Sequence, residues 1–164
     1  MKKLYIMRHA KSSWDEPAPT DYERPLNKRG KHDAPLMGDV LKKLNIKPDI
    51  IISSGAKRAI TTAKLVAEKI DYPIKKIIEE KKIYDESERG ILKIINKLDD
   101  KYSEALLVGH NPVFTGLINI LADYNLPNLP TAALAGIVFE VDQWQAVAMH
   151  LGKVFCYEYP KKYQ

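Results

Sequence analysis

Short apolar runs alternate with helical stripes along this chain, and each run stops abruptly at polar residues. Runs of this kind are typical of strands that are buried on both faces. The predicted strands cover residues 4–7, 50–52, 77–78, 105–108, 136–141 and 146–151, and an extension of the last one to Tyr157 is left open. Strands that alternate with helices favour a mostly parallel sheet covered on both sides. We therefore predict an α/β fold, a three-layer α/β/α sandwich in which the last two segments add an antiparallel edge.

The helices between these strands have recognisable starts. Asn27 is a good N-cap for a helix whose apolar residues run from Ala34 to Leu44. Pro35 lies inside that stripe, so we expect it to kink the helix or delay its start. A stripe over 59–70 predicts a second helix, Ser87 opens a third, and Pro112 suits the first turn of a fourth.

Composition narrows the class of protein. A chain of 164 residues with 45% hydrophobic and 29% charged residues is expected to form one domain, 1–164. No segment approaches the roughly 18 apolar residues of a membrane span, and the run at 4–7 is too short for a signal peptide, so we expect no membrane partner. The single cysteine, Cys156, favours the cytoplasm and is expected to be a small buried side chain.

The net charge of +5 favours acidic ligands in general. Nucleic-acid binders gather such charge in a stripe or tail. Here the lysines form scattered pairs, as at Lys42-Lys43 and Lys161-Lys162. This scatter gives no sign of nucleic-acid binding, so we expect no nucleic acid as partner, and the charge does not choose among the other acidic ligands.

Polar residues with distinct chemistry follow three of the predicted strands. The first strand ends in Arg8-His9, the second leads to Arg58, and a third ends in Gly109-His110. Because ligands of such sheets bind beyond the carboxyl ends of the strands, we expect these side chains to converge. Arginine forks match phosphate oxygens, and a neutral imidazole can attack phosphorus and form a covalent intermediate. The sequence thus predicts a phosphoryl-transfer site.

Four motifs occur in order along the chain: MRHAKSSW at 7–14, ERPLNKRG at 23–30, SSGAKRAITTA at 53–63 and VGHNP at 108–112. With the FEVDQW segment at 139–144, they resemble the histidine phosphatase superfamily over nearly the whole chain. The resemblance is closest to its small single-domain branch, the SixA-like phosphohistidine phosphatases. It implies a phosphoglycerate mutase-like fold.

The resemblance also implies roles for individual residues. His9 is the nucleophile, and Arg8, Arg58 and His110 complete the phosphate pocket. The family's usual glycine after the nucleophile is Ala10 here, which puts the local backbone geometry in question.

The general acid of many relatives is a glutamate after the third strand. In this chain Asp85, Glu86 and Glu88 all lie near that place, and we choose Asp85. A site without a well-marked acid suits phosphohistidine better than sugar phosphates, because a phosphorylated imidazole can leave already protonated. The chain also lacks the long insertions that cover the pocket in larger relatives, so a folded phosphoprotein or a small phosphomonoester fits as the substrate.

Several other residues receive predictions of their own. Ser12 and Asn111 are candidate substrate-binding residues, and Asn111 is also a candidate helix cap. Lys11 and Trp14 follow the nucleophile closely and are expected at the pocket rim, with Trp14 packed as a loop anchor. Structural predictions cover the remaining polar residues: ion pairs for Arg24 and Arg29, one of them with Asp21; a strand-ending hydrogen bond for Ser53; and surface or structural places for His32 and His150.

We therefore predict a phosphatase that uses no cofactor and no metal, since no histidine or cysteine cluster has metal-ligand spacing. It would hydrolyse phosphohistidine or a related phosphomonoester through phospho-His9. Two alternatives remain open: a phosphoglycerate mutase-like transferase, and a binding module that recognises phosphate without turnover.

Overall fold

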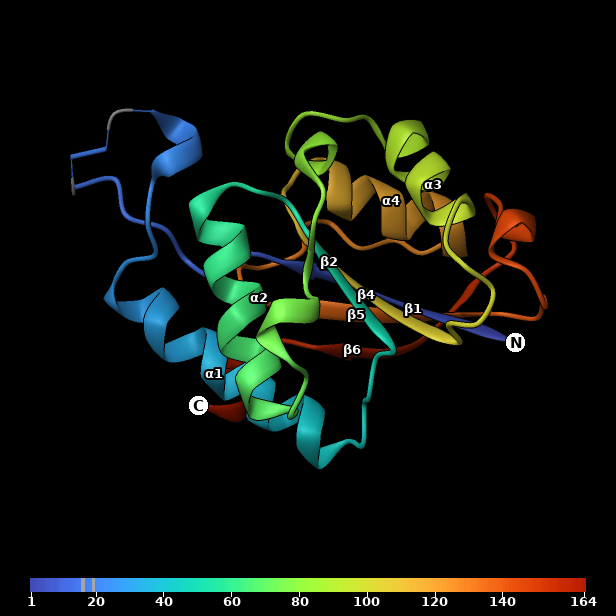
Figure 1. The fold of residues 1–164 in the computed structure, drawn as a ribbon, viewed down its shortest axis with the longest axis horizontal. Coiled ribbons are helices and arrows are strands. Elements are labelled where there is room, and N and C mark those ends of the chain that lie inside the picture. Colours follow the sequence, from blue (N-terminus) through green and yellow to red (C-terminus); the bar gives the residue numbers. More distant parts are fainter. Residues whose placement is uncertain (16, 19) are drawn as a thin grey trace.

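The computed structural model describes residues 1–15, 17–18 and 20–164, and in these residues one six-stranded sheet is flanked by four α-helices (Figure 1). The strands are β1 (Lys2–Arg8), β2 (Ile50–Ser53), β3 (Ile78–Glu79), β4 (Glu104–Gly109), β5 (Leu134–Phe139) and β6 (Lys153–Glu158). The helices are α1 (Lys28–Lys43), α2 (Lys57–Lys69), α3 (Glu88–Asn96) and α4 (Val113–Ala122). Short 3-10 turns lie at Asp21–Glu23, Ile74–Lys76, Lys81–Tyr84, Trp144–Ala146 and Pro160–Tyr163. None of the helices in these residues is long and apolar enough to cross a membrane.

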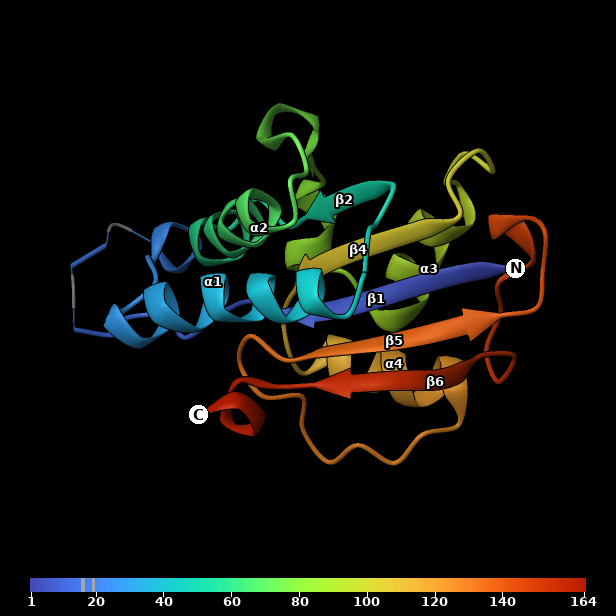
Figure 2. The ribbon, with the colours of Figure 1, turned by 90° about the horizontal axis from the view of Figure 1, so that it is seen from below.

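The sheet is parallel over most of its width. Its strand order is β3-β2-β4-β1-β5-β6, and the four strands from β3 to β1 run parallel to one another (Figure 2). β5 lies antiparallel to both β1 and β6. This topology confirms the predicted mostly parallel sheet with an antiparallel edge.

Helices cover both faces of the sheet, so the central strand β1 is buried on both sides. Successive side chains of a strand point to opposite faces. Leu4 and Ile6 accordingly join the core beneath α3 and α4, whereas Tyr5 and Met7 join the core beneath α1 and α2. These three layers, visible in Figures 1 and 2, confirm the predicted α/β/α sandwich.

The helix starts follow the predicted caps. The Asn27 side chain accepts a hydrogen bond from the Gly30 N–H (2.9 Å), and Ser87 does the same for Gly90 (3.2 Å). α1 begins at Lys28, directly after its cap, so the expected delay at Pro35 is wrong: proline lies inside the helix. The cap and the buried apolar face therefore outweigh the hydrogen bond that proline cannot donate.

The predicted strand is wrong at 146–151, and only its extension to Tyr157 overlaps an observed strand. Trp144–Ala146 forms a 3-10 turn instead, and β6 begins only at Lys153. The Asn96 amide, at the end of α3, donates to the carbonyl oxygens of Trp144 and Val147, both at 2.9 Å. A side chain thus supplies hydrogen bonds that a neighbouring strand would otherwise supply, and the fully buried indole fixes the turn.

The carboxyl ends of β1, β2 and β4 meet at one edge of the sheet. The register pairs Arg8 with Gly109 and Ser53 with Val108. α2 and α4 both begin at this edge, after the strands β2 and β4. The residues that follow the three strands are therefore brought side by side.

Candidate active site

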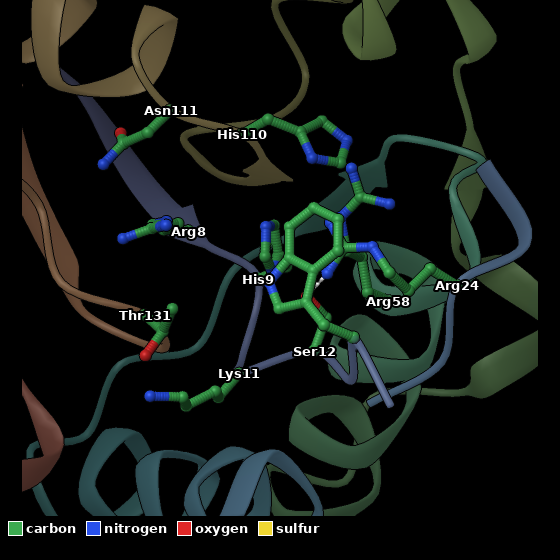
Figure 3. A pocket seen from close by; sticks show the side chains of 10 residues that line it. Arg8, His9, Lys11, Ser12, Arg24, Arg58, His110, Asn111 and Thr131 are labelled. Carbon is green, nitrogen blue, oxygen red and sulfur yellow. Dashed lines mark hydrogen bonds between the residues drawn. The ribbon is translucent and has the colours of Figure 1, made fainter. Parts of the chain in front are cut away.

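A pocket of about 470 Å³ opens at this edge, and we call it the His9 pocket. Figure 3 shows its lining, which comes from strand ends, the start of α2 and neighbouring loops. The lining residues are Arg8, His9, Lys11, Ser12, Trp14, Arg24, Arg58, His110, Asn111 and Thr131. The structure thus brings together both arginines and both histidines that the strand ends predicted. Four of the lining side chains are cationic, and none of the lining residues that the structure describes is acidic.

His9 follows β1 and is held on both sides by its backbone. Its N–H donates to the Gly109 carbonyl (3.0 Å), and its carbonyl accepts from the Ala132 N–H (3.1 Å). The ring nitrogen Nδ1 lies 2.7 Å from the Ala10 carbonyl oxygen. A carbonyl can only accept, so Nδ1 carries the proton and Nε2 carries the lone pair.

Burial keeps this lone pair available. His9 is only 7% exposed, and burial lowers its pKa to about 3; His110, Arg58 and Arg8 act in the same direction. The imidazole is therefore neutral at pH 7. A neutral ring with a fixed tautomer has the form that a nitrogen nucleophile requires.

Ala10 fits its position without strain. Its backbone is not among the left-handed conformations found in the described residues, so glycine is not required there. Its N–H donates to Thr62 Oγ1 (2.9 Å), and that hydroxyl donates to the Arg58 carbonyl (2.7 Å). Thr62 thus joins the loop that carries His9 to the helix that carries Arg58.

Arg8 is fixed through a loop carbonyl. Its Nη1 donates to the Leu129 carbonyl oxygen at 3.1 Å, and the Asn111 amide donates to the same oxygen at 2.9 Å. The Asn111 side-chain oxygen accepts from the Thr115 N–H (3.2 Å) and hydroxyl (2.8 Å). Asn111 therefore caps α4 and orients the Arg8 loop, while also lining the pocket.

Arg58 lies in the first turn of α2 and is held by Asp21. Its Nη1 donates to the Asp21 carbonyl (2.7 Å) and its Nη2 to the carboxylate (3.0 Å). The Tyr84 hydroxyl donates to the same carboxylate at 2.6 Å. This arrangement turns the guanidinium toward the pocket in a fixed orientation.

Arg24 has more contacts than a structural ion pair alone. It binds the Asp21 carboxylate (3.2 Å), as predicted, and Arg29 pairs with Asp33. Arg24 also donates to the Ser12 hydroxyl, and both residues line the pocket. The sequence reasoning missed Arg24 as a pocket residue, although the ERPLNKRG motif pointed to this segment.

Trp14 is not the packed loop anchor that was predicted. Its ring is stacked 3.7 Å from the Arg24 guanidinium and the residue is 80% exposed at the pocket rim. Thr131 also lines the pocket and carried no signal in the sequence. It lies in the loop before β5, and only the fold brings that loop beside Lys11.

His110 faces the pocket opposite His9, with 5.2 Å between the ring centroids. Its Nε2 lies 2.8 Å from the Ser54 hydroxyl oxygen, and the Tyr84 ring packs edge-on against the imidazole. Burial, followed by the charge of Arg58, lowers the pKa of His110 to about 4. An anion bound beside the ring would oppose this shift and favour the cationic, donating form.

Buried polar side-chain atoms without a hydrogen-bond partner gather at this site. Among the described residues, four buried side-chain nitrogen or oxygen atoms have no hydrogen-bond partner. Three of these atoms lie at this site: Arg8 Nε, Arg58 Nε and His110 Nδ1. Buried polar groups are rarely left unpaired unless they serve a function. The site is therefore rich in donors for an oxyanion.

The three candidate acids lie outside the pocket lining. Asp85 is exposed at the end of the Lys81–Tyr84 turn. The Glu86 carboxylate lies against Gly90 of α3, and that of Glu88 lies against Gly116 of α4. Helix α3 draws this segment toward α4, so the structure does not bring the predicted general acid to His9.

The remaining histidines lie elsewhere. His32 is exposed and contacts Asp33 (3.2 Å), and His150 pairs with Asp123. Within the described part of the chain, no group of three or more histidine, cysteine or acidic side chains could hold a metal ion. Ser53 donates to the Ser54 carbonyl (2.9 Å), the strand-ending hydrogen bond predicted for it.

Comparison with known proteins identifies the family. A family model described as the histidine phosphatase superfamily (branch 1) matches residues 4–83, which include Arg8, His9 and Arg58. An uncharacterized protein of Mycobacterium tuberculosis (strain ATCC 25618 / H37Rv) is 33% identical over 116 residues, covering 71% of this chain and 70% of that protein. The chain belongs to the histidine phosphatase superfamily.

Further similarities of this histidine phosphatase superfamily member concern a longer relative and the fold. An uncharacterized chloroplastic protein of Arabidopsis thaliana is 29% identical over 136 residues, 82% of this chain; the chain spans about half of that relative, 53% of its length. A structure of the protein histidine phosphatase SixA complexed with tungstate matches with a TM-score of 0.84 at 20% identity, over 99% of both chains. The chain therefore has the fold of SixA, as the motifs predicted.

Proposed function

We propose that this protein is a phosphatase that hydrolyses phosphohistidine in proteins through a covalent intermediate on His9. The observation that carries the proposal is the neutral His9 ring. Its Nδ1 is bound to the Ala10 carbonyl, and its unprotonated Nε2 lies in a pocket with Arg8, Arg58 and His110.

The chemistry follows from this arrangement in two steps. In the first, the Nε2 lone pair attacks phosphorus, a P–Nε2 bond forms, and the bond to the leaving group breaks with its electron pair. In the second, water attacks phosphorus, the P–Nε2 bond breaks, and inorganic phosphate leaves while His9 returns to its neutral form. Arg8, Arg58 and His110 stabilise the negative charge on the phosphoryl oxygens during both steps.

The absence of an acid among the described lining residues favours phosphohistidine as the substrate. An alkoxide leaving group needs a proton in the transition state. An imidazole that leaves phosphorus can carry its proton on the other ring nitrogen already. The likeness to SixA in complex with tungstate, a tetrahedral oxyanion, supports the same assignment.

The experiment compares His9→Gln with His32→Gln, since His32 is an exposed histidine outside the pocket. With an aryl phosphate, His9→Gln should lower kcat by at least about a thousandfold, whereas His32→Gln should keep the wild-type rate. Rapid denaturation in alkali should trap one labelled phosphoryl group on the wild type and none on His9→Gln. Wild-type turnover by His9→Gln would overturn the mechanism.

A panel of phosphohistidine protein, phosphoserine peptide and sugar phosphate then identifies the substrate class. We expect the highest kcat/KM for phosphohistidine. Phosphoglycerate interconversion would favour a transferase instead. Tight binding of phosphopeptides without phosphate release would favour a binding module.

A further inference from the structure

A second cavity opens beside the His9 pocket and shares part of its wall. It has a volume of about 250 Å³, and Lys11 and Thr131 line both cavities. Arg29, Tyr159 and Lys161 also line it, and we call it the Lys161 groove. In Figure 3 the Lys11 side chain extends on the Thr131 side of the His9 pocket. A substrate whose phosphoryl group occupies the pocket can therefore extend into the groove.

Two cations of the groove are not neutralised by the protein. Lys11 and Lys161 are exposed, and neither forms an ion pair or side-chain hydrogen bond with any residue that the structure describes. The acid in the groove wall, Asp33, is only 1% exposed and is bound by Arg29 (3.3 Å) and by Gln164 (2.8 Å). Its charge is thus balanced locally, and the two lysines leave the groove positive.

The neighbouring lysine behaves differently. Lys162 donates to the Glu158 carboxylate at 3.0 Å, and Tyr163 donates to the same group. Lys161 lies one residue earlier, lines the groove and has no such partner. The 3-10 turn Pro160–Tyr163 therefore holds one lysine in an ion pair and presents the other to the groove.

We propose that the Lys161 groove binds an acidic side chain of the phosphorylated polypeptide, close to the phosphohistidine whose phosphoryl group enters the His9 pocket. This inference rests on the proposed function. Pro130, Tyr159 and Pro160 line the same groove as the two lysines. Apolar rings beside two lysine head groups suit a carboxylate on an aliphatic stem, as in a peptide, better than a fully hydrated second phosphate.

The test uses two phosphohistidine peptides that differ only by Glu or Gln beside the phosphorylated residue. At low ionic strength the wild type should show a kcat/KM about twofold to fivefold higher for the Glu peptide, mainly through KM. Lys161→Gln should remove this preference. Lys97→Gln makes the same charge change at an exposed lysine after α3 that lines neither cavity, and it should keep the preference.

The outcomes separate the groove from the catalytic proposal. Unchanged hydrolysis of an aryl phosphate by Lys161→Gln would show that the variant folds and that its His9 pocket is intact. Equal kcat/KM of the wild type for both peptides would overturn the groove proposal alone. If Lys161→Gln weakened the hydrolysis of small bisphosphates but changed nothing for the two peptides, the groove would bind a second phosphate, and the peptide would be ruled out as its occupant. If the wild type hydrolyses no phosphorylated compound, the proposed function fails. The affinities of the wild type for the two intact peptides then still test the groove proposal, which requires stronger binding of the Glu peptide.

Discussion

The Asp21 carboxylate binds the Arg58 guanidinium at 3.0 Å, and the Asp21 carbonyl oxygen accepts a second hydrogen bond from it at 2.7 Å. A hydrogen bond from Tyr84, followed by the charge of Arg58, lowers the pKa of Asp21 to about 2. The carboxylate is therefore ionised throughout the neutral range. It orients Arg58, which lines the His9 pocket, without lining the pocket itself.

Asp21→Asn should lower kcat/KM for an aryl phosphate by about tenfold, because a misplaced guanidinium stabilises the transferred group less well. Without this negative charge the pocket would also attract an anionic substrate more strongly. This opposing effect is small, because the Asp21 side chain is 47% exposed and solvent screens its charge. Glu23→Gln is the matched control, since Glu23 lies on the same turn and, among the described residues, its carboxylate accepts only from Thr20 (3.1 Å). An unchanged or higher kcat/KM in Asp21→Asn would contradict this role.

Ser54→Ala should lower kcat by roughly tenfold or more, because it removes the hydroxyl that positions His110 Nε2. Its KM for substrate should change less, since both arginines keep their contacts. Ser53→Ala is the control: both serines are fully buried, but within the described part of the chain the Ser53 hydroxyl bonds only the Ser54 carbonyl. Steady-state kinetics across pH 5–8 provides the measurement, and equal effects of the two substitutions would point to a purely structural role.

The sequence predicted the fold well where a single local signal determines the element. Charge-free runs gave β1, β2 and β4, and Asn27 and Ser87 marked the starts of α1 and α3. The prediction failed at 146–151, where the deciding contact comes from Asn96, about fifty residues earlier. No local pattern contains a hydrogen bond of that kind.

The site shows the same division. Arg8, His9, Arg58 and His110 follow strands or begin a helix, so topology alone predicts that they converge. The bonds of Asp21 to Arg58 and Tyr84, and the place of Thr131, depend on loops whose paths the sequence does not specify. The choice of Asp85 as the acid relied on nearness in sequence, and the structure leaves Asp85 outside the lining of the His9 pocket.

Thr62→Val should lower the free energy of unfolding by about 2 kcal/mol, because the buried Ala10 N–H loses its acceptor. The substitution preserves the shape of the side chain, so lost packing contributes little. Thr61→Val, at the half-buried neighbouring position, should change stability by less than about 0.5 kcal/mol. Urea unfolding of both variants measures the difference. Equal changes in the free energy of unfolding would contradict the structural role of the Thr62 hydroxyl.

Asp85→Asn should keep kcat/KM within about twofold for phosphohistidine and aryl phosphate alike, since ordinary surface substitutions have small effects. The carboxylate is exposed and lies outside the pocket lining. Parallel assays of Glu86→Gln and Glu88→Gln extend the test to the other two candidate acids. A loss of a hundredfold in any of the three, with the basic limb of the pH profile altered, would identify a general acid that reaches the pocket during turnover.

Acid should destabilise this protein through its two pocket histidines. Burial lowers the pKa of His9 to about 3 and that of His110 to about 4, against 6.5 in the unfolded chain. Between these values the unfolded chain binds more protons, so stability is complete above pH 6.5 and is lost as the pH falls.

From pH 7 to pH 5 each histidine should cost about 2 kcal/mol of unfolding free energy. In His9→Gln the loss over this interval should therefore be smaller by about 2 kcal/mol, while exposed His32→Gln should behave as the wild type. Urea unfolding at the two pH values measures each loss. An equal loss in His9→Gln and wild type would show that burial does not hold the pKa of His9 below its ordinary value.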